Sequence, residues 1–326
     1  SEDSRRRSVD TFWGVEAEEH EHVRAGIVQD LLGTASSAGR FALAMPALTR
    51  LGLKHALRLL KLGGSELPVP FTAPRTVLNE PLTSERSVAI TDLPLDRVHN
   101  VAEHAAVTVN DVLLELCDRA MTRYLRVQGQ TPDQPLVAQM PVSLRRDNCD
   151  RGNQITIAIL ELGSTETNPV RRLQDIHEHA RDVKQELSDM RPETAEVYTL
   201  LMQSVAQFGE TLGIGDIVPP LGNVVISNFI GPKKQQYLCG APMLATYPIS
   251  TIAPGLALNI TIYTYMQTLH IGLVAGHRAI PDLQPIVDYM QSALNELEDA
   301  MGLEVKPAGP RKTGKRKSKQ RQAAGQ

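Results

Sequence analysis

The stretch ALNITIYTY at residues 257–265, followed closely by TLHIGLVA at residues 268–275, is the clearest fold signal in the sequence. Both runs are rich in the β-branched and aromatic residues that favour strands. Only Met266 and Gln267 separate them, so we expect an antiparallel hairpin. A third β-rich run, NVVIS at residues 223–227, precedes them and predicts a further strand.

Strand-like and helix-like segments alternate irregularly along the rest of the chain. Three more segments are typical of strands: residues 87–91, 136–142 and 154–162. Helical periodicity predicts helices over residues 95–105, 109–127, 169–187 and 192–212, and a last helix that begins at Asp282. The fold class that follows is α/β, an α+β mixed sheet with flanking helices.

The N-terminal part, residues 1–73, is predicted to be a linker with helices. It includes a basic, apolar helix near residues 47–62, in which four cations share one narrow stripe: Arg50, Lys54, Arg58 and Lys61. Such a helix either packs into a groove with its basic side outside or lies in a membrane interface, and the sequence is compatible with both. Closely spaced prolines end this part, so a folded domain is expected over residues 74–303.

Composition and charge limit the function classes. The 326 residues are 42% hydrophobic and 22% charged, which is typical of a globular protein, and no apolar stretch approaches the roughly 20 residues of a membrane span. The three cysteines, Cys117, Cys149 and Cys239, are widely separated, which fits neither a disulfide framework nor a zinc site. This favours a reducing, cytoplasmic setting. Ser1 to Asp10 lacks the apolar segment of a secretory signal, and we expect the chain to begin inside a longer protein.

Residues 304–326 form a basic tail with eight Lys or Arg residues against the single Glu304. Its prolines and glycines and its lack of apolar residues predict disorder. Polybasic segments bind anionic lipid, so the tail predicts peripheral attachment to a membrane surface or lipid droplet. A basic tail does not discriminate between polyanions, and no specific nucleic-acid binding is predicted.

The sequence lacks the familiar signatures G-x-S-x-G, Walker A, G-x-G-x-x-G and H-E-x-x-H, so hydrolase, NTPase and dinucleotide functions are disfavoured and no metal site is expected. His177 and His179 lie with Asp182 in a polar helical stretch that we interpreted as a solvated face. Arg172 supports this interpretation, because arginines around the histidines are typical of an exposed helix face. Thr108 and Asp111 have the spacing of a capping box, worth about 1 kcal/mol.

Several motifs together resemble the bacterial wax ester synthase/diacylglycerol acyltransferase family. They are PRTVLN (74–79) with Arg86, VNDV (109–112), PVSLR (141–145) with Gly152-Asn153, NVVISNFIGP (223–232), Tyr247-Pro248 and LALN (256–259). The similarity extends from about residue 74 to 303. Two departures stand out: Phe229 and Ile230 replace the family's usual Val and Pro, and the family's H-H-x-x-x-D-G motif occurs nowhere in the sequence.

The resemblance implies a chloramphenicol acetyltransferase-like, CoA-dependent acyltransferase lobe, the second of two lobes around a tunnel. The reaction implied is transfer of a fatty acyl group from acyl-CoA, as a substrate, to diacylglycerol or a long-chain alcohol, with no cofactor. The catalytic histidine belongs to the absent motif, so we expect no catalytic residue in this chain. The chain alone should be inactive without its N-terminal lobe, because positioned acid/base catalysis contributes roughly 100- to 10,000-fold.

Five residues are candidate site residues by this resemblance. Asn110 and Asp111 are expected to hold a helix start beside the tunnel, and Ser227, Asn228 and Arg145 to contact acyl-CoA or substrate. The expected location is the cytoplasm, peripherally on the inner membrane or lipid droplets. Two alternatives remain: a non-catalytic lipid-binding or scaffold protein of the same fold, and a condensation or polyketide-associated acyltransferase lobe.

Overall fold

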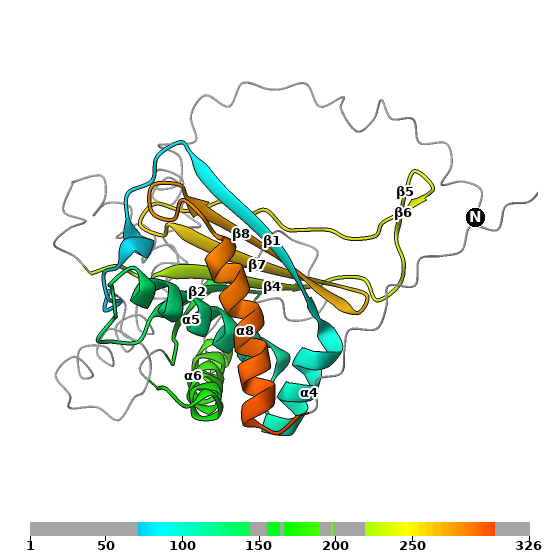
Figure 1. Ribbon diagram of the computed structural model, residues 1–326, viewed down its shortest axis with the longest axis horizontal. Helices are drawn as coiled ribbons and strands as arrows, with labels where there is room; N and C mark the ends of the chain where they lie inside the picture. The colour runs from blue at the N-terminus through cyan, green and yellow to red at the C-terminus, as the bar shows by residue number, and fades with distance from the viewer. Residues whose placement is uncertain (1–70, 144–154, 164–165, 190–196, 198–218, 304–326) are drawn as a thin grey trace, which may run out of the picture.

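The computed structural model describes residues 71–143, 155–163, 166–189, Val197 and 219–303. Six strands form one mixed sheet in the order β1-β8-β7-β4-β2-β3 (Figure 1). Their bounds are β1 Arg86–Pro94, β2 Val137–Ser143, β3 Ile155–Glu161, β4 Val224–Ile230, β7 Leu258–Tyr265 and β8 Thr268–Gly276. β4 pairs in parallel with β2 and with β7, and the other three pairs, β1–β8, β7–β8 and β2–β3, are antiparallel.

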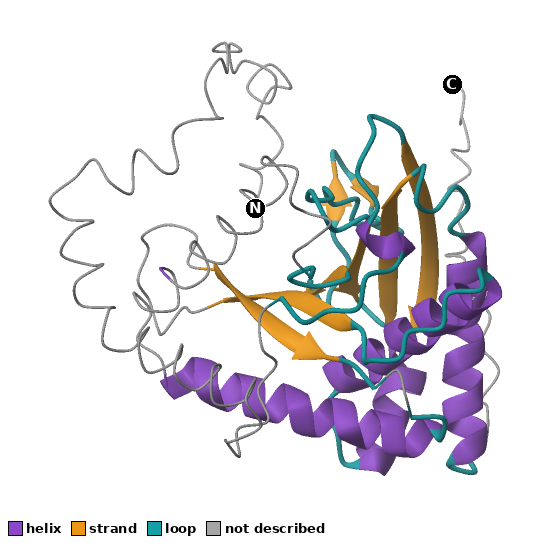
Figure 2. Ribbon diagram, turned by 90° about the vertical axis from the view of Figure 1, so that its left-hand side faces the viewer, coloured by secondary structure: helices purple, strands orange, loops and turns teal. Residues whose placement is uncertain are grey.

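Four helices cover one face of the sheet: α4 Leu95–Ala105, α5 Val109–Val127, α6 Pro169–Asp189 and α8 Gln284–Ala300. Figure 2 shows them gathered on one side of the strands. The strand residues on that face form the main core, because alternate side chains of β7 and β8 point toward the helices and have no exposed surface: Leu258, Ile260, Ile262, Leu269, Ile271 and Leu273. Burial of this apolar surface is the main stabilising term of the fold.

The opposite face of β7 and β8 is covered by residues 247–252, which we call the strap. Ser250 Oγ lies 2.8 Å from Thr261 Oγ1, and the Asn259 amide donates to the Thr251 carbonyl at 3.0 Å. The carbonyl of Pro248 lies against the Cα of Gly272, where a side chain would overlap it. The polar residues of β7 are therefore buried with hydrogen-bond partners, as buried polar groups require.

The predicted elements that fall on described residues are confirmed with small changes at their ends. α4 and α5 have the predicted bounds, and the predicted hairpin is β7–β8. The predicted strand ends at Ser227, which is wrong: β4 continues to Ile230, so Ser227 and Asn228 both lie within the strand. The sequence did not reveal the short hairpin β5 Tyr237–Leu238 and β6 Ala241–Pro242, which stands away from the main sheet (Figure 1), nor the 3-10 helix η2 Val77–Asn79.

Three of the predicted segments fall on residues that the structure does not describe. They are the N-terminal helices up to residue 70, most of the predicted helix 192–212, and the basic tail from residue 304. Among the helices that the structure does describe, none is long and apolar enough to cross a membrane.

Replacing Gly272 by alanine should displace the strap. The added methyl group would overlap the Pro248 backbone, which cannot rotate away as a side chain can, so Gly272→Ala should lower the free energy of unfolding by about 1–3 kcal/mol, measured by urea denaturation. Gly276→Ala on the same strand is the matched control, because its methyl group would meet only the movable end of Leu82, at 3.0 Å. Equal losses in the two variants would contradict the tight seating of the strap.

Candidate functional site

The first turn of α5 is fixed by Asp111. Thr108 Oγ1 accepts from the Asp111 backbone N–H at 3.2 Å, and Asp111 Oδ2 accepts from the Thr108 backbone N–H at 2.9 Å, which confirms the capping box. His177 Nδ1 on α6 lies 2.7 Å from the same Oδ2. The Asp111 side chain is only 4% exposed, so its carboxylate is occupied by the protein itself and holds the helix start in place.

Asn110 precedes Asp111 on α5, and its side-chain amide faces β4. Asn228 Nδ2 is 3.5 Å from Asn110 Oδ1, so the two amides are neighbours at the limit of a hydrogen bond. Asn228 is exposed near the carboxyl end of β4, which runs parallel to β7 and β2. The carboxyl edge of parallel strands is where open α/β sheets bind ligands. The two amides form a polar corner at that edge.

Ser227 belongs to the other face of the sheet. Side chains alternate along a strand, and Ile226 is in the helix-side core while Asn228 meets α5, so Ser227 points toward the opposite face. It pairs in register with Thr261 and is 7% exposed. The structure therefore does not bring Ser227 and Asn228 together. Arg145 lies outside the described residues.

The chain around the carboxyl edge exposes large apolar side chains. The segment after β4 is held to β7, because the Gly231 N–H donates to the Thr264 carbonyl at 2.9 Å and the Met266 N–H donates to the Pro232 carbonyl at 3.1 Å. The exposed apolar residues of these connected segments, which we call the apolar edge, are Phe229, Ile230, Tyr237, Leu238, Leu244, Ile249 and Met266. Exposed large apolar side chains are candidates for contact with a ligand or another protein surface.

The interpretation of the α6 polar stretch as a solvated face is wrong for two of its residues. Arg172 is 5% exposed and bound to Asp118, and His177 is bound to Asp111. His179 Nδ1 lies 3.1 Å from the Glu161 carbonyl, not at Asp182. No local pattern could have shown these contacts, because His177 and Asp111 are 66 residues apart in the sequence.

A second carboxylate-bound histidine lies on the strap side of the sheet. His270 Nδ1 is 2.7 Å from Asp92 Oδ1, and the Tyr247 hydroxyl donates to Asp92 Oδ2 at 3.1 Å. The Tyr247 ring meets the His270 ring edge-on at 5.1 Å, and His270 Nε2 has no hydrogen-bond partner among the described residues. A carboxylate that orients imidazole is one part of a base-activated nucleophile, but no hydroxyl of the described chain is bound to Nε2.

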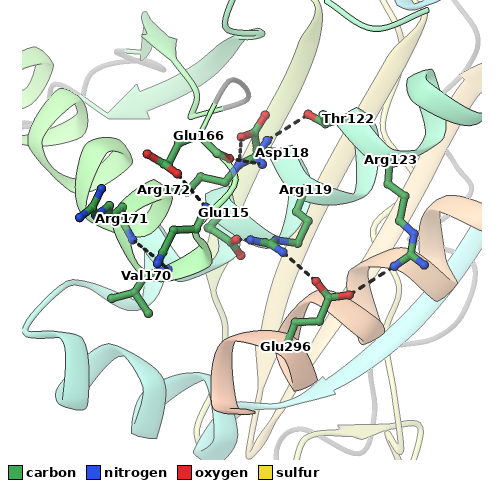
Figure 3. A network of polar contacts seen from close by, with 11 residues as sticks. Glu115, Asp118, Arg119, Thr122, Arg123, Glu166, Val170, Arg171, Arg172 and Glu296 are labelled. Atoms are coloured by element: carbon green, nitrogen blue, oxygen red, sulfur yellow. Dashed lines mark hydrogen bonds and ion pairs between the residues drawn. The ribbon is translucent and has the colours of Figure 1, made fainter. Parts of the chain in front are cut away.

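The outer part of α5 holds a buried ion network, which Figure 3 shows from close by. Arg172 Nε donates to Asp118 Oδ2 at 2.8 Å, and Arg119 Nε donates to Glu115 Oε1 at 2.9 Å. Arg119 also donates to Glu296 of α8 at 2.7 Å. Burial raises the pKa of the Glu115 carboxyl to about 7, although Arg119 lowers it, and burial also raises the pKa of Asp118. The described residues contain no group of three or more His, Cys, Asp or Glu that could hold a metal ion.

A mixed sheet with four helices on one face defines an α/β lobe, and the polar corner at its carboxyl edge is the candidate site. Comparison with known families agrees with the motifs. The model of the wax ester synthase/diacylglycerol acyltransferase catalytic domain matches residues 1–113, and that of the family's C-terminal domain matches residues 151–298.

Known relatives point the same way. A Mycobacterium tuberculosis protein, assigned by its name to the diacylglycerol O-acyltransferases, is 36% identical over 281 residues, which are 86% of this chain and 61% of the relative. The O-acyltransferase WSD of Acinetobacter baylyi is 33% identical, over 70% of this chain and 50% of its own length. The solved wax ester synthase/diacylglycerol acyltransferase of Marinobacter aquaeolei VT8 is 32% identical, with a TM-score of 0.63 over 79% of this chain and 57% of that one.

The chain belongs to the wax ester synthase/diacylglycerol acyltransferase family, as the motifs predicted. The fold class is confirmed with it, since the structure has a mixed sheet with flanking helices and matches the solved relative with a TM-score of 0.63. The chain spans between half and about three fifths of the length of these relatives.

The raised pKa of Glu115 predicts how stability changes with pH. Between pH 4.5, the ordinary pKa of Glu, and about pH 7, the folded chain keeps a proton that the unfolded chain has released. The free energy of unfolding should therefore fall as the pH rises through this window, by up to about 3 kcal/mol, and change no further because of Glu115 above it. Urea denaturation over this pH range measures the slope.

The variant Glu115→Gln should reduce that slope, since the glutamine cannot titrate. Glu178→Gln, which changes an exposed carboxylate on α6, is the matched control and should keep the slope of the unchanged chain. A Glu115→Gln variant with an undiminished slope would show that Glu115 is not the titrating group.

Substitutions of Asn110 and of Asp111 should affect the free energy of unfolding differently, because Asp111 stabilises the helix start and Asn110 lies at the polar corner. Asp111→Ala removes the acceptor for the Thr108 N–H and for His177, so it should lower the free energy of unfolding by about 1–3 kcal/mol. Asn110→Ala loses only the long contact to Asn228 and should stay within about 0.5 kcal/mol of the unchanged chain. Urea denaturation of both variants measures the difference. A larger loss for Asn110→Ala would reverse the assigned roles.

Proposed function

We propose that this chain supplies one lobe of an O-acyltransferase that transfers a fatty acyl group from acyl-CoA to diacylglycerol or a long-chain alcohol. The observation that supports this best is the polar corner of Asn110 and Asn228 at the open, apolar edge of the sheet, in a chain of this family. A fatty thioester and a lipid alcohol both need an apolar surface that removes them from water. They also need a few polar groups that fix the reacting atoms.

In the proposed reaction the alcohol oxygen attacks the thioester carbonyl carbon, the C–S bond breaks, and the proton of the alcohol ends on the CoA sulfur. No further cofactor is needed. The amides of Asn110 and Asn228 can donate to the thioester oxygen or accept from the attacking hydroxyl, and Asp111 keeps this corner in place. The Asp111 carboxylate is nearly buried and already bound by His177 and by the Thr108 N–H, so we assign it a positioning role.

We infer that the proton acceptor belongs to an H-H-x-x-x-D-G segment of a further lobe, since this sequence contains no such motif. The apolar edge supports this inference, because exposed side chains such as Ile230 and Leu244, each 83% exposed, suit contact with another lobe. The relatives also extend well beyond the part that matches this chain. The alternative is a non-catalytic scaffold of the same fold that binds lipid at the apolar edge.

We also propose that the protein acts from the cytoplasm at the surface of the inner membrane or of lipid droplets, where its lipid substrates and products reside. The basic tail, eight Lys or Arg residues within 304–326, supports attachment through anionic lipid.

An ester-forming assay tests the proposed function. The chain is incubated with labelled palmitoyl-CoA and either hexadecanol or dioleoylglycerol, first alone and then with a separately expressed N-terminal lobe of a relative that carries H-H-x-x-x-D-G. We expect ester only in the mixture. Asn110→Ala should lower that turnover by about tenfold or more if its amide acts on the reacting atoms. Glu178→Gln should leave it unchanged.

Two other results would overturn parts of the proposal. Turnover by the chain alone would show that the base lies within it, and His177→Gln and His270→Gln would then identify which carboxylate-bound histidine supplies it. Binding of palmitoyl-CoA without turnover in either condition would favour the scaffold alternative.

A further inference from the structure

A pocket of about 410 Å³ lies at the end of α5 that is remote from the polar corner. Sixteen residues of helix separate Asn110 from Arg126, which is about 24 Å along the axis. The pocket is lined by residues of α5, by the turn before α6, by Arg172 of α6 and by Glu296 of α8. Its lining is Arg119, Thr122, Arg123, Arg126, Val127, Glu166, Thr167, Arg172 and Glu296. It is thus separate from the proposed acyl-transfer site.

Three of the pocket's arginines stack on one side of α5. Arg119, Arg123 and Arg126 are spaced i, i+4 and i+7, which places them on successive turns of the same helix face. Like charges at this spacing destabilise a helix by a few tenths of a kcal/mol for each pair. An anion bound beside these arginines would reduce their mutual repulsion.

The carboxylates of the network leave the outer cations incompletely neutralised. Arg172 is paired with Asp118, and Arg119 with Glu115 and Glu296 (Figure 3). Arg123 shares Glu296 with Arg119, at a longer 3.3 Å, and otherwise stacks on the Tyr289 ring. Arg126 is exposed, and within the described part of the chain it makes no ion pair. The lining contains four arginines and two glutamates. Glu115 and Asp118 of the network pair with Arg119 and Arg172, so the exposed Arg123 and Arg126 have donors left for a ligand.

We propose that this pocket binds the phosphate group of a phosphate ester. Arginine donors in a planar fork suit phosphate oxygens, and Arg123 and Arg126 can each donate two N–H groups to one phosphate. The start of α6 adds a weak positive potential beside Glu166 and Thr167. The volume exceeds that of a bare phosphate ion, and Val127 offers an apolar wall, so the pocket fits an ester with a small organic group.

The phosphate can come from a soluble ester or from a phospholipid head group, and the experiment separates these sources. The full chain is titrated with inorganic phosphate, with glycerol 3-phosphate, with phosphatidylcholine vesicles, and with the same vesicles containing phosphatidic acid. Calorimetry measures the soluble ligands and co-sedimentation measures the vesicles. We expect binding of glycerol 3-phosphate or of the phosphatidic acid vesicles, tighter than binding of inorganic phosphate or plain vesicles.

The variants assign that binding to the pocket. Arg126→Gln, an exposed position, and the pair Arg123→Gln with Arg126→Gln should weaken binding by about tenfold or more. Arg181→Gln removes the same charge from an exposed site on α6 outside the pocket and should bind like the unchanged chain. The basic tail is present in every variant, so its contribution cancels.

Three results would overturn the proposal. One is no binding of any phosphate ester by the unchanged chain. Another is binding by the Arg126→Gln variant that equals binding by the unchanged chain. The third is an equal loss of binding in the Arg126→Gln and Arg181→Gln variants, which would reflect net charge alone. Matching melting temperatures of Arg126→Gln and the unchanged chain confirm that the comparison concerns binding.

Discussion

The enclosure of β7 and β8 between the helices and the strap is the constraint on which the rest of the structure depends. Their alternate apolar side chains complete the core beneath the helices, while Asn259, Thr261 and Gly272 meet the strap. A hairpin buried on both faces cannot shift its register by one residue without exchanging its apolar and polar sets. The fixed hairpin in turn sets the position of β4, and with it the carboxyl edge.

At that edge two neighbouring residues of one motif have different tasks. Asp111 is nearly buried and closes the first turn of α5, while Asn110 faces the exposed amide of Asn228. The division follows from helix geometry, because successive residues point about 100° apart around the axis. The Asp111 carboxylate also joins α5 to α6 through His177, so the polar corner rests on a contact between two helices.

The half of α5 that is remote from the polar corner places charged side chains in the protein interior. Glu115 and Asp118 have no exposed surface, and each is paired directly with one arginine, Glu115 with Arg119 and Asp118 with Arg172. A buried ion pair of this kind contributes little net stability, but removal of one partner is costly. The same arginines reach the pocket between α5, α6 and α8, so the network ties a structural element to a surface site.

The sequence by itself determined the element types, the hairpin and the family, because strand alternation, helical periodicity and motifs such as VNDV are local properties of the chain. It also predicted the capping box at Thr108 and Asp111, since both partners lie within one turn. Strand alternation by itself places Ser227 and Asn228 on opposite faces, but only the tertiary structure decided that Asn228 meets Asn110, that His177 binds Asp111, and that Arg172 is buried against Asp118. Those contacts join residues far apart in the sequence, and only the packing of helices on the sheet brings them within hydrogen-bond distance.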